Sequence, residues 1–170
     1  MIDEMRYFLR YGLYEEAVEV GKKTDIDKLD LKEKIQFYKL MALSYRKLEL
    51  QDHALIYISK AISIITEQKK LDDSLERELA ICFMNKGVIY DSQKDYDKAC
   101  EIYLQAIRIF RKIEPLEKNI LINALINYAE ALVNGGKERK ARFIYEETLS
   151  YIEDNEDIRK KYIEEKLTKL

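Results

Sequence analysis

The chain has 170 residues, of which 47% are apolar and 36% charged, a mixture typical of a folded domain and not of a disordered segment. Its 30 basic and 32 acidic residues leave a net charge of −2, so the overall balance does not favour nucleic acid or an anionic membrane. Five glycines and one proline are too few for the turns of a β-sandwich or a Rossmann-like sheet, and they indicate long helices. No apolar run approaches the roughly 20 residues of a membrane span, and the acidic N-terminus differs from a signal peptide. We therefore expect a cytoplasmic protein with no membrane partner.

Apolar spacing and turn signals predict nine helices along the chain. Their expected ranges are 2–11, 14–23, 29–48, 51–69, 72–93, 96–113, 116–134, 138–152 and 155–169. Pro115 is expected in the first turn of the seventh helix, where its missing N–H does no harm. Gly135 and Gly136 are expected to end that helix in a left-handed conformation. Asp154 or Asn155 is expected to cap the last helix.

A pattern of small and large residues recurs along these helices. It runs through Gly87, Tyr90, Ala99, Tyr103 and Ala106. The same offsets counted from Ala42 and from Ala129 again alternate small and large, with Thr148 as the one polar departure. Small residues let two antiparallel helices cross closely, and large ones fill the gap to the next pair. One pair cannot cover its own apolar face, so the pattern predicts stacked units.

This helix-pair pattern resembles the tetratricopeptide repeat (TPR) family. Phe83, Asn85, Gly87 and Tyr90 match the family's first helix, and Tyr96, Ala99, Tyr103 and Ala106 match its second. The resemblance implies an all-α protein, a TPR-like α-solenoid of about four antiparallel helix pairs plus a C-terminal capping helix. We expect one domain over 1–170, with a degenerate unit at 1–28, repeats at 29–71, 72–114 and 115–152, and a cap helix at 153–170. The first unit is interpreted as degenerate because Gly21 stands where a large residue belongs.

The repeats are longer than is usual for this family, because the anchors lie 42 and 45 residues apart instead of about 34. Long pairs of this kind are similar to the repeat domains of Rap and PlcR-like peptide receptors of Gram-positive bacteria. Eight of the thirteen tyrosines occupy repeat positions, where they are expected to pack between helices. These are Tyr14, Tyr38, Tyr45, Tyr90, Tyr96, Tyr103, Tyr128 and Tyr145. Ile158, Tyr162, Ile163 and Leu167 of the last helix are expected to form a lid over the final pair.

No residue pattern indicates catalysis, a metal or a cofactor. His53, the sole histidine, lies beside Asp52 at a helix start, where it is a general base on one reading and a surface side chain on the reading we favour. Cys82 and Cys100 have no partner at metal-ligand spacing, so we expect reduced, packed thiols. Phosphate-loop, dinucleotide and metalloprotease motifs are missing from the sequence. The sequence therefore predicts a protein that is not an enzyme.

The resemblance implies that the first helix of each pair lines a concave groove. Projecting the face opposite the packing stripe gives Arg6, Arg10, Lys39, Leu43, Arg46, Met84, Asn85, Val88, Asn123, Ile126, Asn127 and Glu130. We expect a protein or peptide partner whose acidic groups meet the basic side chains and whose backbone bonds to Asn85 and Asn127. The plainer reading is a solvated basic face, with both asparagines serving contacts inside the repeats.

Two other functions remain open at this stage. A solenoid with imperfect caps can form a homodimer through its terminal helices, here through Ile158, Tyr162 and Ile163. Nucleic-acid binding through a basic patch spanning Arg6 and Arg46 is disfavoured by the balanced charge.

Overall fold

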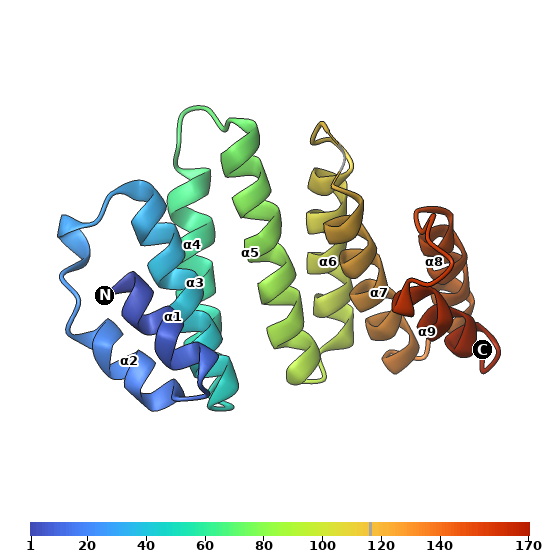
Figure 1. Ribbon diagram of the computed structural model, residues 1–170, viewed down its shortest axis with the longest axis horizontal. Coiled ribbons are helices and arrows are strands. Elements are labelled where there is room, and N and C mark those ends of the chain that lie inside the picture. The colour runs from blue at the N-terminus through green and yellow to red at the C-terminus, as the bar shows by residue number, and fades with distance from the viewer. Residues whose placement is uncertain (116) are drawn as a thin grey trace.

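A computed structural model describes residues 1–115 and 117–170, and within them the chain is all-helical, with nine α-helices and no strand (Figure 1). The helices are α1 Ile2–Arg10, α2 Tyr14–Lys22, α3 Leu31–Lys47, α4 Gln51–Thr66, α5 Asp73–Ser92, α6 Tyr96–Phe110, α7 Lys118–Asn134, α8 Glu138–Ser150 and α9 Ile158–Leu167, with a short 3-10 turn at Ile26–Lys28. The predicted helices are thus confirmed in number and order. The first residue of the predicted seventh helix, 116, lies outside the described residues.

The helices stack in chain order from one end of the molecule to the other. Each contacts the next, so that α1 and α2, α3 and α4, α5 and α6, and α7 and α8 form successive hairpins, and α9 packs on the last of them (Figure 1). Neighbouring units share two apolar clusters, one centred on α3 and α4 and the other on α6 and α7. This arrangement confirms the predicted solenoid of stacked helix pairs. None of the described helices has the length and apolar character needed to cross a membrane.

Local sequence signals explain where several helices begin and end. Asp30 and Glu33 form a reciprocal capping box at the start of α3, which satisfies backbone donors that the first helical turn leaves free. Gly136, just past α7, has a φ of 72°, which confirms the expected left-handed backbone. Two boundary predictions are wrong. Pro115 precedes α7, whose N-cap is Glu117, and Asp157, not Asp154 or Asn155, caps α9 through the backbone N–H of Arg159.

The small residues of the repeat do stand at close helix crossings. A Cβ on Gly87 of α5 would lie 2.5 Å from Cε1 of Tyr103 on α6, so only glycine fits there. Ala99 and Ala106 are fully buried in the same hairpin. In the degenerate first unit, the side chain of Met41 fills the space beside Gly21. A flexible thioether from the next unit therefore replaces the large side chain that the repeat pattern expects there.

The other packing predictions are largely confirmed. None of the eight repeat tyrosines is classed as exposed, whereas His53 is exposed and stacks on Tyr45 with ring centroids 5.0 Å apart. Cys82 and Cys100 are free, buried thiols. The predicted lid face of α9 is wrong at one position, because Ile163 is fully buried but Ile158 is 81% exposed. Five residues correspond to about 1.4 helical turns, so these two isoleucines lie on different faces of the helix.

Candidate protein-binding groove

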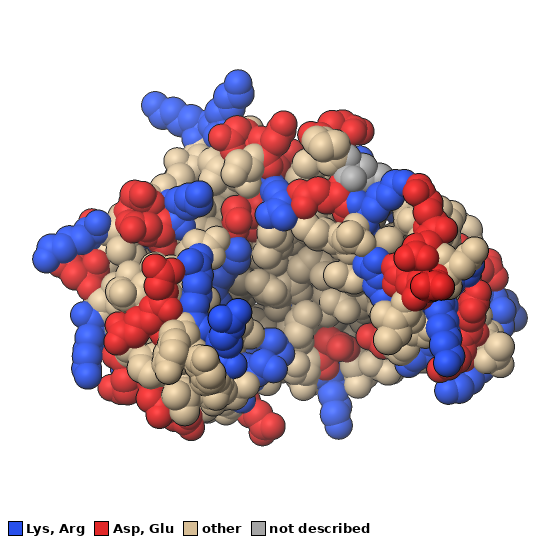
Figure 2. All heavy atoms as spheres, in the orientation of Figure 1, with Lys and Arg blue, Asp and Glu red and all other residues tan. Residues whose placement is uncertain are grey.

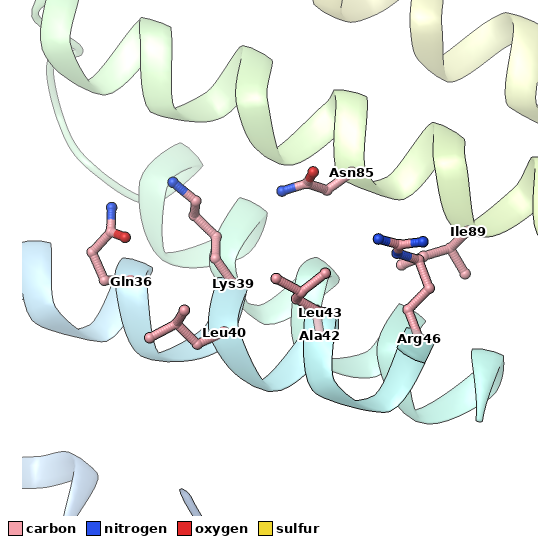
Figure 3. A pocket seen from close by; sticks show the side chains of 8 residues that line it. All are labelled: Gln36, Lys39, Leu40, Ala42, Leu43, Arg46, Asn85 and Ile89. Atoms are coloured by element: carbon pink, nitrogen blue, oxygen red, sulfur yellow. The ribbon is translucent and has the colours of Figure 1, made fainter. Parts of the chain in front are cut away.

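The face of the molecule seen in Figure 2 is hollowed at its centre, between the N-terminal helices and α9. The floor of the hollow is mostly uncharged, and Lys and Arg side chains gather on its N-terminal side, over α1 and α3 (Figure 2). A pocket of about 130 Å³ lies between α3 and α5. It is lined by Gln36, Lys39, Leu40, Ala42, Leu43, Arg46, Asn85 and Ile89 (Figure 3). Four of the predicted groove residues, Lys39, Leu43, Arg46 and Asn85, therefore meet in one place.

The two cations of this pocket are in different states. Lys39 Nζ lies 2.7 Å from Oε2 of Glu78 on α5, and both side chains are only 15% and 21% exposed, so its charge is already compensated. Arg46 has no carboxylate partner among the residues that the structure describes. Its guanidinium lies beside Asn85 and Ile89 at the edge of the pocket (Figure 3). Arg46 is thus the side chain of this pocket that remains available to an anionic group.

Two further hollows adjoin this pocket through Gln36. One of about 240 Å³ lies between α1 and α3 and includes Arg6, Lys32 and Gln36. The other, of about 350 Å³, lies at the N-terminal ends of α3 and α5 and is lined by Asp30, Leu31, Lys32, Ile35, Gln36, Asp72, Ser74, Leu75 and Glu78. Arg6 therefore faces the same system of hollows as Gln36. Arg10, on the last turn of α1, is exposed.

The middle of the groove is formed by α5. Asn85 is exposed, whereas Met84 and Val88 are half-buried and pack on the apolar cluster around α6 and α7. One turn further along, Oδ1 of Asp91 is buried without a hydrogen-bond partner in the described part of the chain. Burial raises the pKa of this carboxyl, the nearby Asn134 amide acts in the opposite direction, and the charge of Glu130 raises it further. This end of the groove therefore carries two carboxyl groups, those of Asp91 and Glu130.

The C-terminal part of the projected groove is partly covered by α9. Arg159 donates to Oδ1 of Asn119 at 2.8 Å and to Oδ1 of Asn123 at 3.4 Å. The hydroxyl of Tyr162 donates to Glu130, and burial together with that bond raises the pKa of Tyr162. Ile126 and Asn127 are half-buried beside these contacts. The sequence predicted α9 only as an apolar lid, and the three-residue spacing of Arg159 and Tyr162 on one helix was the one signal for this polar contact.

Within the described residues, no three His, Cys, Asp or Glu side chains cluster in a way that could hold a metal ion. The groove as built can offer one free guanidinium, exposed amides and apolar side chains. These groups suit the reversible binding of a polypeptide.

The sequence profile of the tetratricopeptide repeat matches residues 78–154. This match and the stacked hairpins support the tetratricopeptide repeat family. The matched segment runs from within α5 to just past α8, and so covers the α5–α6 and α7–α8 hairpins. A comparison with curated protein sequences finds no match.

Solved TPR structures show the same fold. The TPR-like repeats of a putative kinesin light chain from Podosopora anserina align with a TM-score of 0.78 at 16% identity, over 99% of this chain and 82% of that one. The N-terminal domain of stress-induced protein-1 (STI-1) from C. elegans aligns with a TM-score of 0.62 at 15% identity, over 82% of this chain and 98% of that one. At such identities the likeness concerns the fold alone. TPR folds commonly mediate interactions between proteins.

Proposed function

We propose that this protein is a non-enzymatic binding module, an adaptor or regulatory receptor that holds a protein segment or peptide in its concave groove. The observation that carries the proposal is the pocket between α3 and α5, where an uncompensated Arg46 stands beside the Asn85 amide and the apolar side chain of Leu43. An anionic side chain of the partner pairs with Arg46, while Asn85 bonds to its backbone. Leu43 and Ile89 pack against an apolar side chain of the partner that lies next to the anionic one.

Lys39 and Arg46 have different roles in this proposal. Lys39 is held by Glu78 and shapes the pocket wall, so it is not expected to read acidic groups itself. At the opposite end, Asn123 and Glu130 are bound by α9, which leaves Ile126 and Asn127 as the candidate contacts of α7. The long repeat period is consistent with the peptide-receptor subgroup of TPR proteins, and a cytoplasmic location suits such a receptor; both belong to this proposal.

The test begins with recovery of partners from a cell extract on the immobilised protein, followed by binding of the purified partner to charge-reversal variants. Arg46→Glu is expected to weaken binding by about tenfold or more, because it replaces a charge-assisted bond with repulsion. Arg139→Glu, on the exposed surface of α8, is the matched control and should bind as the parent protein does. Equal binding by both variants would remove the groove from the proposal.

The alternative of assembly through the C-terminal helix receives little support from the packing. Of the three side chains on which it depended, Ile163 is fully buried and Tyr162 is bonded to Glu130, so only Ile158 faces solvent. Nucleic-acid binding through the basic patch is also less favoured, because Glu78 already neutralises the charge of Lys39.

A further inference from the structure

The solvent-exposed side of α1 carries an aromatic stripe. Tyr7 is 56% and Tyr11 63% exposed, and their ring centroids lie 4.7 Å apart. Asp3 precedes Tyr7 by four residues, so Asp3, Tyr7 and Tyr11 follow one another along one side of the helix. Neighbouring aromatic rings in water are characteristic of interaction surfaces, where tyrosine is enriched. The stripe lies at the N-terminal end of the solenoid, away from the C-terminal cap (Figure 1).

We propose that this stripe is a homodimer interface in which the α1 helices of two copies pack antiparallel around a two-fold axis at Tyr7. A two-fold interface must be complementary to itself. In such a pair Tyr7 meets the Tyr7 of the second copy, and residues equally far before and after it lie opposite each other.

The charges of α1 favour a second copy over an unrelated partner. The helix carries Asp3 and Glu4 in its first turn and Arg10 in its last. On a helix with 100° per residue, Arg10 lies only 20° around the axis from Asp3, so both stand on the same side of Tyr7. The two-fold axis therefore sets Asp3 of each copy beside Arg10 of the other. Asp3 keeps 94% of its side chain exposed although Arg6 contacts it, and Arg10 has no ion pair within the described residues.

The size of the stripe limits the strength of the dimer. A nine-residue helix is about 14 Å long, and the surface it presents is smaller than the roughly 800 Å² per partner of a standard stable interface. The dimer is therefore expected to be weak and to form as the protein concentration rises.

Sedimentation velocity over a concentration series tests the proposal. The parent protein is expected to shift from monomer to dimer, and Tyr7→Ala is expected to raise the dissociation constant by about tenfold or more, since it removes the central contact. Phe143→Ala, which removes a 66% exposed aromatic side chain from α8, is the matched control and should dimerise as the parent does. A parent protein that stays monomeric at every concentration, or a dimer that Tyr7→Ala leaves intact, overturns the proposal.

A charge exchange tests the antiparallel arrangement itself. Asp3→Arg and Arg10→Asp should each weaken the dimer, because each places like charges together twice per dimer. The double variant Asp3→Arg/Arg10→Asp restores both pairs and should recover dimerisation. Circular dichroism confirms that each variant remains folded. A folded double variant that stays as weak as the single ones contradicts the arrangement. These results do not bear on the pocket between α3 and α5, since none of the α1 variants changes a residue that lines it.

Discussion

At the C-terminal end of the solenoid α9 lies over α7 and α8 with Ile163 fully buried, whereas at the N-terminal end the outer face of α1 leaves Tyr7 and Tyr11 in solvent. The first end is closed by a helix of the same chain, which bonds through Arg159 and Tyr162 to the concave side of α7. No described helix covers the other end. A terminal repeat needs a cover with a polar outer face, and in the dimer proposed above the second copy supplies that cover at the N-terminal end.

The largest effect is expected when the C-terminal cover is loosened. Ile163→Ala should lower the free energy of unfolding by about 2 to 5 kcal/mol, because it leaves a cavity beneath α9. Ile158→Ala, in the same helix but exposed, should change it by less than about 0.5 kcal/mol. Urea denaturation followed by circular dichroism measures both. Equal losses would mean that α9 does not cap the solenoid through Ile163.

The next largest effect is expected at the helix crossings, where Gly87 meets a rigid tyrosine ring and Gly21 meets a flexible methionine. Gly87→Ala is expected to cost about 1 to 3 kcal/mol, because the added Cβ meets the ring of Tyr103, which is only 1% exposed. A gain of about 1 kcal/mol in helix propensity offsets part of this cost, so the net loss of stability is at most about 2 kcal/mol. In the first unit, Gly21→Ala meets the flexible end of Met41 and should cost less. Thermal melts of the two variants rank the crossings, and a Gly87→Ala protein as stable as the parent would contradict the close packing of α5 on α6.

The two cysteines report separately on the two apolar clusters. Burial raises the pKa of Cys82, in the N-terminal cluster, to about 12, and it also raises the pKa of Cys100, in the C-terminal cluster. Neither thiol should react with iodoacetamide near pH 8 until the surrounding helices open. In Ile163→Ala, alkylation of Cys100 should become several times faster than that of Cys82, as followed by mass spectrometry. Equal acceleration at both sites would show that the solenoid opens as one unit.

The smallest effects concern pH. Burial raises the pKa of Asp91 above its ordinary 3.8, so the folded protein holds this proton more tightly than the unfolded chain does. Its contribution to stability is therefore lost as the pH rises through the raised pKa. Over that range the free energy of unfolding of Asp91→Asn should rise relative to that of the parent protein.

The pKa of Asp157 is shifted in the opposite direction, since its bonds to Arg159 lower it to about 2. Asp157→Asn should be the less stable protein above pH 3.8, and the difference should shrink as the pH falls toward 2. Denaturation at a series of pH values checks both slopes.

Much of the architecture could be predicted because it depends on local periodicity. The order of the helices, the left-handed Gly136 and the packing of the repeat tyrosines, four buried and four half-buried, follow from spacings of three and four residues and from turn chemistry. The close approach at Gly87 also follows, since a small residue facing a large one is written into the repeat. The candidate groove was predicted only in part. Four of the predicted residues line one pocket, namely Lys39, Leu43, Arg46 and Asn85. The ion pair in which Glu78 neutralises the charge of Lys39 was not predicted.

The sequence by itself determined the helices, their pairing into hairpins and the need to stack, because these depend on which side chains recur within a few turns. Only the tertiary structure decided which surface stays open. Ion pairs such as Lys39 with Glu78 and Arg77 with Glu117 join residues about 40 positions apart, and their formation depends on the angle between successive hairpins. The same holds for α9, whose Arg159 and Tyr162 turn toward Asn119 and Glu130 only because the stacking brings α7 beneath them. Sequence spacing specifies neighbours along a helix, whereas contacts between units arise from the geometry of the whole stack.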